Sequence, residues 1–268
     1  MHCIKSHLLI PAICLSSLLT LSLGSFPQLV LAENSNTPRQ GLPGRRVGGG
    51  SRGNCNFGDK TLTALIPKNN LGVTVAGHPK FFFYIPQTTN SQLVEFVLRD
   101  ETDRQIYETT FKTTGTSGVI SLSLPNSAPL KALQIGKKYQ WYFSIICNAQ
   151  NRANDVSVDG WIQRVEPSPT LASELEKAAP RERAALYATA GIWHEALTTL
   201  AALHHSRPND STIATEWAQL LQSVGLDNIA QEPFKASYPV EHKVPNKSDV
   251  GTTGSVSVSA GRDGALLP

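Results

Sequence analysis

The hydrophobic period of this chain changes once, and the change separates two kinds of structure. From Cys55 to about residue 166, apolar and polar residues alternate with a period of two, as half-buried strands require. After "VEPSPT" at 165–170, apolar residues recur at the helical period of 3.6, among many Ala and Leu residues. We therefore predict an α+β protein, with a β-domain at 55–166 followed by a helical unit at 167–226.

The β-domain is predicted to be an antiparallel β-sandwich, because its strands are short and regularly separated by turn signals. The alternation in "KYQWYFSIIC" places Tyr139, Trp141 and Cys147 on one face, and Trp161 lies in the last strand. The L-x-x-G-x-x-Y spacing that ends at Tyr139 resembles a tyrosine corner, so we expect a sandwich that is immunoglobulin-like in outline. The Cys and Trp spacing of immunoglobulin domains proper is absent. The candidate strands are 62–67, 80–86, 93–100, 105–113, 118–125, 138–148 and 156–165.

The helical unit is predicted to be a small, tetratricopeptide-like hairpin with additional helices. Helices are expected at 170–178, 181–190, 193–206 and 211–224. Tyr187, Ala196 and Leu200 have the spacing of a tetratricopeptide repeat, and Trp193 is expected to pack near Tyr187. Because a free solenoid needs ~3 repeats, a single hairpin must pack on the sandwich or on a partner.

The stretch "GIWHEALTTLAALHH" at 191–205 raises the question of a metal site. A zincin helix needs a second histidine four residues after the first, but that position after His194 is Thr198. His204 lies ten residues on, or ~15 Å along a helix, too far to share an ion. We predict no metal and no cofactor, and place His194, His204 and His205 on the exposed side as a possible interaction surface.

The N-terminal residues 1–32 have the pattern of a signal peptide. Lys5 precedes an apolar run at 8–23, and "VLA" at 30–32 ends in a small residue. An uncleaved membrane anchor is the alternative, since the run is nearly long enough to span a bilayer. We expect an exported protein, periplasmic or extracellular, with no integral span in the mature chain.

The segments that flank the predicted domains have little apolar content. Residues 33–54 are rich in Gly and Arg, which favours a flexible linker over an RNA-binding arm. Residues 227–268 are predicted to be a disordered tail. The 24 Lys and Arg residues against 21 Asp and Glu residues give no reason to expect a nucleic-acid partner.

Two cysteines, Cys55 and Cys147, remain once the predicted signal peptide is removed. Export to an oxidising compartment favours a disulfide between them. Two unrelated thiols, one of them buried, are the alternative.

The sequence contains weak candidates for chemistry but no convincing catalytic set. His78 is the only histidine of the β-domain, which excludes a Ser/His/Asp triad or a multi-histidine metal site within it. Asp100, Glu101 and Asp103 are either turn formers or a glycosidase-like carboxylate pair. The Asn- and Asp-rich loop at 147–159 is either a solvated turn or a calcium loop. We predict that the protein is not an enzyme.

Several segments together resemble a known family. They are "CNFGDKTLTALIP", "VEFVLRDE", "YQWYFSIIC", "VDGWIQRV" and "LYATAGIWHEALTTLAAL". They look like the cyanobacterial family of exported proteins catalogued as domain of unknown function 928. The resemblance implies export, a β-rich part followed by helices, and no established activity, cofactor or catalytic residue.

These observations leave three hypotheses about function. The first is an exported, non-catalytic protein-interaction module of the cell envelope, whose partner is another envelope or exported protein. The second is a glycan- or small-ligand-binding sandwich that uses Phe82, Tyr84 and Tyr142, unless these rings fill a second core layer. The third is a hydrolase of unfamiliar design that uses Asp100, Glu101 or Asp103.

Overall fold

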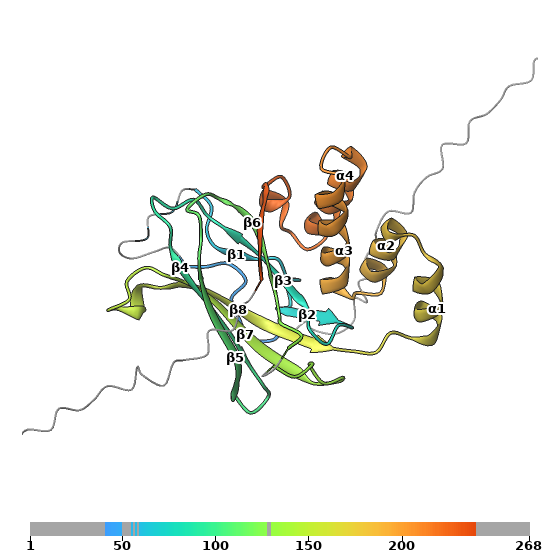
Figure 1. The fold of residues 1–268 in the computed structure, drawn as a ribbon, viewed down its shortest axis with the longest axis horizontal. Helices are drawn as coiled ribbons and strands as arrows, with labels where there is room; N and C mark the ends of the chain where they lie inside the picture. The colour runs from blue at the N-terminus through green and yellow to red at the C-terminus, as the bar shows by residue number, and fades with distance from the viewer. Residues whose placement is uncertain (1–40, 50–54, 56, 58, 128–129, 240–268) are drawn as a thin grey trace, which may run out of the picture.

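The protein has a mixed α+β fold (Figure 1). The computed structural model describes residues 41–49, 55, 57, 59–127 and 130–239. Within these ranges the chain forms two β-sheets and four α-helices. The predicted signal peptide at 1–32, residues 33–40 and 50–54 of the predicted linker, and residues 240–268 of the predicted tail lie outside the described residues.

Two sheets pack face to face through one shared core. The four-stranded sheet has the order β1-β3-β6-β9 and the five-stranded sheet the order β2-β8-β7-β4-β5. Phe83 and Phe143, one from each sheet, stack with their ring centroids 3.9 Å apart. The strands are β1 (Thr63–Ala64), β2 (Leu71–Thr74), β3 (Lys80–Ile85), β4 (Leu93–Arg99), β5 (Gln105–Lys112), β6 (Gly118–Ser123), β7 (Lys138–Ile146), β8 (Val156–Arg164) and β9 (Phe234–Pro239).

Strand β3 is covered on both faces, which explains its unbroken apolar sequence "FFFYI". Phe81 and Phe83 point into the core between the sheets. Phe82 and Tyr84 point the other way and are buried beneath the helices. The helices therefore form a third layer on the outer face of the four-stranded sheet.

Two strands, β2 and β9, were not predicted, and both pair in parallel. β2 pairs with β8, and β9 pairs with β6, so the sheets are mixed rather than purely antiparallel as expected. The prediction of disorder from residue 227 is wrong for 227–239, which form a short 3₁₀ helix (Asp227–Ile229) and then β9. The sequence did not predict β2 and β9 because a short strand is stabilised mainly by its ladder partner, and a partner distant in sequence leaves no local signal.

The four predicted helices are present close to their expected ends. They are α1 (Pro169–Lys177), α2 (Pro180–Thr189), α3 (Trp193–Ser206) and α4 (Ser211–Gln222). Pro169 and Pro180 occupy the first helical positions, where a missing N–H is harmless. Gly191 connects α2 to α3 with a φ of 70°, a left-handed conformation that glycine adopts without a steric penalty.

The Gly/Arg-rich segment is ordered at 41–49, which corrects the prediction of a flexible linker for these residues. Arg45 forms a β-bridge with Asp159, so the segment lies beside β8. The Arg46 guanidinium donates to the carbonyl oxygen of Val224 at 2.8 Å and to that of Ile66 at 3.2 Å. Burial lowers the pKa of Arg46. The segment therefore connects the sheets to the C-terminal end of the helical layer.

The aromatic residues predicted as structural lie in the β-domain core or on its covered surface. Trp141 is fully buried. The backbone N–H of Gln134 donates to the Tyr139 hydroxyl at 3.0 Å. Trp161 is half-buried, and its indole N–H donates to the carbonyl of Pro43 at 2.9 Å.

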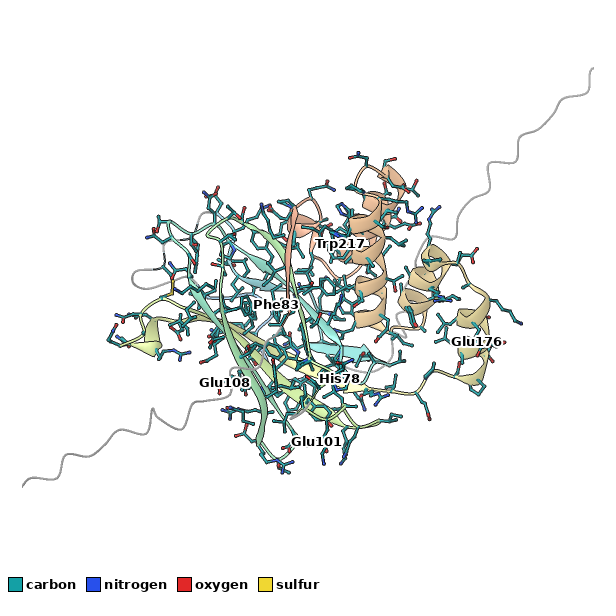
Figure 2. All side chains as sticks on the ribbon, viewed as in Figure 1. His78, Phe83, Glu101, Glu108, Glu176 and Trp217 are labelled. Carbon is teal, nitrogen blue, oxygen red and sulfur yellow. A yellow bond between two sulfur atoms is a disulfide. The ribbon has the colours of Figure 1, made fainter. Side chains whose placement is uncertain are left out.

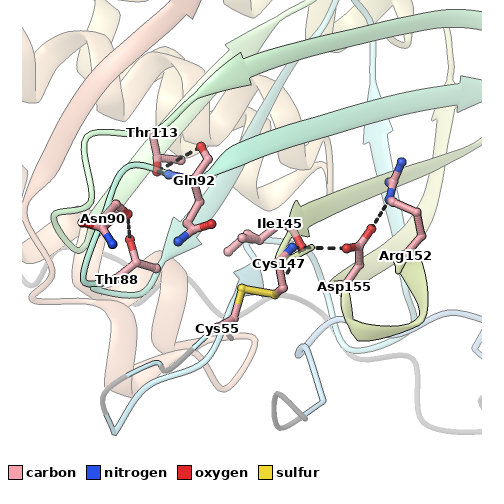
Figure 3. The surroundings of a disulfide bond; sticks show 9 residues. All are labelled: Cys55, Thr88, Asn90, Gln92, Thr113, Ile145, Cys147, Arg152 and Asp155. Carbon is pink, nitrogen blue, oxygen red and sulfur yellow. Dashed lines mark hydrogen bonds and ion pairs between the residues drawn. A yellow bond between two sulfur atoms is a disulfide. The ribbon is translucent and has the colours of Figure 1, made fainter. Parts of the chain in front are cut away.

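Cys55 and Cys147 form the predicted disulfide, at the end of β7 (Figure 3). Their Cα atoms are 5.3 Å apart, and 92 positions separate them in sequence. The backbone N–H of Cys147 donates to Asp155 at 3.2 Å, and Asp155 is itself ion-paired with Arg152. The disulfide therefore ties the beginning of the described β-domain to one of its central strands.

In the described part of the chain, no helix combines the length and the apolar character needed to cross a membrane.

Candidate functional site

Three consecutive residues at the start of α3, Trp193, His194 and Glu195, attach the helix to the sheets. Successive helical residues point about 100° apart, since a turn holds ~3.6 residues. The three side chains therefore face different directions, and each bonds to a different part of the β-domain. We call this set the α3 anchor.

Trp193 bonds to the segment that follows β1. Its indole N–H donates to the carbonyl oxygen of Leu65 at 2.7 Å, and the side chain is almost fully buried. The bond satisfies a carbonyl that has no access to water, where an unsatisfied polar group is costly.

His194 bonds to β3 and lies against β2. Its Nδ1 is 2.8 Å from the carbonyl oxygen of Lys80, and since a carbonyl only accepts, Nδ1 carries the proton. The ring packs edge-on against Phe81 with the centroids 5.2 Å apart. Nε2 has no hydrogen-bond partner among the described residues, and it faces Gly72 so closely that a β-carbon there would come within 2.3 Å.

Burial lowers the pKa of His194 to about 4, against the opposing effect of its bond to Lys80. The imidazole is therefore neutral at neutral pH. The prediction that His194 is exposed is wrong, because the side chain is only 2% accessible. The physical reason is that α3 packs on β2 and β3 through its first turn, so this side of the helix never meets solvent.

Glu195 bonds to the end of β2. Its Oε1 accepts from the Thr74 hydroxyl at 2.6 Å and from the backbone N–H of Ala76 at 3.1 Å. Burial raises the pKa of Glu195, although these hydrogen bonds act in the opposite direction. Its second oxygen, Oε2, has no partner within the described ranges.

The α3 anchor has the perturbed pKa values that often mark an active site, but its geometry is structural. His194 and Glu195 face different elements, and neither lines any of the three cavities described below. Across the described residues, no group of three or more His, Cys, Asp or Glu side chains is arranged to hold a metal ion.

A groove of about 680 Å³ lies between α3 and the outer face of the four-stranded sheet. His204 and His205 reach it from the last turn of α3. The His204 ring packs on Phe234 of β9, with the centroids 4.6 Å apart. We call this the α3–β9 groove; its lining residues are Lys80, Phe82, Ser121, Thr198, Ala201, Ala202, His204, His205, Pro208, Phe234 and Lys235.

Of the histidines predicted as an interaction surface, two therefore lie at an open groove and one is buried. His205 is exposed and His204 is half-buried. Sequence reasoning missed Lys80 and Lys235, because they belong to strands that only the folded sheet brings near α3.

A second cavity, of about 550 Å³, includes Asp100 and Glu101 from the loop between β4 and β5. Hydrogen bonds from Thr102 and Arg104 lower the pKa of Asp100 to about 2. Bonds from the Lys137 ammonium at 2.9 Å and from a backbone N–H lower the pKa of Glu101. A general acid needs a raised pKa, so neither carboxyl is suited to that role.

Asp103, the third acid of this loop, does not line that cavity. It accepts a hydrogen bond from Arg99 at 2.9 Å and has a φ of 63°. Asp is one of the residues that tolerates this left-handed conformation, so Asp103 acts as a turn residue.

A third cavity, of about 780 Å³, is lined by residues of α1 and α2. These two helices lie at the outer edge of the helical layer (Figure 1). Its lining includes Leu171, Ala185 and Leu186, with Glu174, Glu182 and Lys177 beside them. Charges of both signs therefore line this cavity.

The aromatic rings proposed for glycan binding are mostly inside the protein. Phe82 and Tyr84 are each 3% accessible, and Phe82 packs against Trp217 with ring centroids 6.2 Å apart. Tyr142 is half-buried, with the Arg99 guanidinium 5.6 Å from its ring centroid. Phe82 and Tyr84 fill the second core layer beneath the helices.

Several side-chain oxygens of the Asn- and Asp-rich loop at 147–159 accept hydrogen bonds from within the loop. Asn151 accepts from the backbone N–H of Ala153 and so caps the short 3₁₀ helix Arg152–Asn154. Asp155 bonds to Cys147 and Arg152, as described above. The turn is therefore stabilised by its own hydrogen bonds.

Together, the fold and these sites define a mixed α+β protein in which a helical layer is fixed on a two-sheet body. A sequence model of the family described as Domain of Unknown Function (DUF928) matches residues 47–234, more than half of the chain. The chain belongs to this family. No curated protein matches it.

Proposed function

We propose that this chain is an exported, non-catalytic protein-interaction module of the cell envelope, and that the α3–β9 groove is its binding surface. Export rests on the signal-peptide pattern at 1–32, and it fits the disulfide between Cys55 and Cys147, since such bonds persist in oxidising compartments. We also propose that the protein is cyanobacterial and that it is located in the periplasm or outside the cell.

The observation that carries the proposal is an open groove with fixed walls. The α3 anchor holds one wall to β3, to the end of β2 and to the segment that follows β1 through four hydrogen bonds of 2.6–3.1 Å. A preformed groove loses little conformational entropy when a partner binds. By contrast, the carboxylates that could support hydrolysis are held in ion pairs and turn hydrogen bonds.

We also propose that the two-sheet body is immunoglobulin-like in outline and that the helical unit contains a tetratricopeptide-like hairpin. An immunoglobulin-like outline is supported by the bond from Gln134 to the Tyr139 hydroxyl, as in a tyrosine corner. A tetratricopeptide-like hairpin is supported by Ala196 and Leu200, which are buried between neighbouring elements. Tyr187 packs at the edge of the same cluster as Trp193.

The glycan-binding hypothesis is weaker, because two of its three rings are buried. The hydrolase hypothesis is weaker because hydrogen bonds lower the pKa of Asp100 and of Glu101, and Asp103 is held by Arg99 as a turn residue. Neither hypothesis has an observation that favours it over the groove.

Site-specific photocrosslinking in native cells tests the proposal. A photoreactive amino acid at Ala202, exposed in the groove, is expected to give a defined crosslinked product with another envelope protein. The matched control places the same amino acid at Glu108, exposed on β5 (Figure 2). A product from Glu108 alone would refute the groove as the binding surface, and no product from either position would refute the interaction module.

A further inference from the structure

We propose that the α3–β9 groove binds an extended, acidic peptide segment with apolar side chains, contributed by the partner protein. This inference rests on the proposed function and specifies the chemistry of the partner. It follows from the charge, spacing and apolar lining of the groove.

Among the described residues that line the groove, the charged and titratable side chains are all basic. Lys80 enters from β3, Lys235 from β9, and His204 and His205 from α3, and this described lining includes no Asp or Glu. Neither lysine takes part in an ion pair with another described residue. Their charges are therefore free to attract a negatively charged ligand.

The register of the sheet places the two lysines far apart. Tyr84 of β3 pairs with Val119 of β6, which pairs with Phe234 of β9. Lys235 is thus two strands away from Lys80 across the sheet. Along the strand direction it is displaced from Lys80 by between three and four residues. At ~4.8 Å between strands and ~3.3 Å per residue, the two Cα atoms are roughly 15 Å apart. A small anion contacts one end of such a groove, whereas an extended segment reaches both.

Apart from the lysines and histidines, the described lining of the groove is apolar or hydroxylated. It consists of Phe82, Ala201, Ala202, Pro208 and Phe234, together with Ser121 and Thr198. A ligand that carried only charges would leave these side chains without apolar contact. A segment that alternates acidic and apolar residues satisfies both parts of the groove, since alternate side chains of an extended chain point in opposite directions.

Fluorescence anisotropy with a labelled octapeptide of alternating Glu and Leu tests this inference. We expect binding that weakens at high salt, and that weakens at least about tenfold in the double variant Lys80→Glu/Lys235→Glu, where attraction becomes repulsion. The matched control is Lys112→Glu/Lys131→Glu, which changes the net charge equally at two exposed lysines outside the groove. The control variant is expected to bind as the unchanged protein does.

Three further results would overturn the inference. The first is that both double variants weaken the binding of the acidic octapeptide equally. The second is that an octapeptide of alternating Gln and Leu binds as tightly as the acidic one. The third is that octanoate displaces the acidic octapeptide at a concentration similar to that of the peptide. Circular dichroism checks that each variant is folded, and the milder pair Lys80→Gln/Lys235→Gln is expected to bind with intermediate strength. If Ala202 crosslinks to a partner but the acidic octapeptide does not bind, the proposed function stands and this inference fails.

Discussion

The Nε2 atom of His194 lies against the backbone of Gly72, where a β-carbon would come within 2.3 Å of it. A β-carbon essentially never comes closer than 3.0 Å to a heavy atom to which it is not linked through the local backbone. The helical layer therefore sits on β2 at a distance that only glycine permits. This contact makes Gly72 a residue on which the docking of α3 depends.

Gly72→Ala is expected to destabilise the protein by roughly 1–3 kcal/mol, because the added methyl must displace His194 and with it the start of α3. The matched control is Gly49→Ala, where the nearest atom to a new β-carbon is 3.7 Å away. That change is expected to stay within ~0.5 kcal/mol. Urea unfolding measures both, and equal midpoints for the two variants would contradict the close contact.

A double-mutant cycle isolates the contact between Gly72 and His194. His194→Ala is expected to cost roughly 2–4 kcal/mol through the cavity and the lost bond to Lys80. In the presence of His194→Ala, Gly72→Ala has space for its methyl and is expected to cost much less than alone. The expected coupling energy is about 1 kcal/mol or more. Additive effects would show that the two residues do not meet.

Acid is expected to weaken the docking of α3 through His194. Burial lowers its pKa to about 4, while an unfolded histidine titrates near ~6.5. The unfolded chain therefore takes up the proton first, and the stability contributed by neutral His194 is present above about pH 6.5 and lost as the pH falls towards 4. The full effect is on the order of 3 kcal/mol.

Two variants separate this effect from other titrations. His194→Asn keeps a donor near the carbonyl of Lys80 but does not titrate, so its deficit relative to the unchanged protein should shrink as the pH falls. The raised pKa of Glu195 has the opposite sign, because its contribution is lost as the pH rises through the folded pKa. Glu195→Gln should therefore steepen the acid loss. A deficit of His194→Asn that is constant with pH would contradict the assignment.

Trp193 and Trp217 form a natural pair for measuring the hydrogen bond of the α3 anchor. Both are 2% accessible, but Trp193 donates to Leu65, whereas the Trp217 indole N–H has no partner in the described part of the chain. Changing each to Phe removes a similar volume. Trp193→Phe is expected to cost roughly 1–3 kcal/mol more, because it leaves a buried carbonyl unsatisfied. Equal losses in thermal unfolding would mean that the bond contributes little.

Local pattern was enough to predict the helices and most strands. The helical period placed Trp193, Ala196 and Leu200 on one stripe, and all three are buried. It failed for His194, since that residue is buried by β2, a strand of four residues that pairs with β8 some ninety positions later. No residue pattern near "LGVT" predicts this pairing. Without it, a polar side chain on a surface helix is expected to be exposed.

The α3–β9 groove could not be predicted from the sequence, because its lining also depends on elements that are distant in the chain. His204 and His205 were chosen from their place on α3, but Lys80 and Lys235 are 155 positions apart in the numbering. Lys80 reaches the groove because α3 packs on β3, and Lys235 reaches it because β9 returns to β6 after the helices. The composition of "FKASYP" resembles the polar tail that follows it, so the sheet's ladder, and not local propensity, decides that it is a strand.

The disulfide between Cys55 and Cys147 is expected to stabilise the folded protein. Because 92 positions separate Cys55 from Cys147, closing this loop restricts the unfolded chain strongly and is expected to stabilise the fold by roughly 4–5 kcal/mol in the chain-entropy account. Replacing both cysteines with Ser should lower the melting temperature, and a reductant should do the same to the unchanged protein while leaving the double variant unaffected.

The α3 anchor lies in the other core cluster, so the effects of Cys55→Ser/Cys147→Ser and Trp193→Phe are expected to add. Strong coupling between them would show that the β-domain and the helical layer unfold through a shared set of contacts.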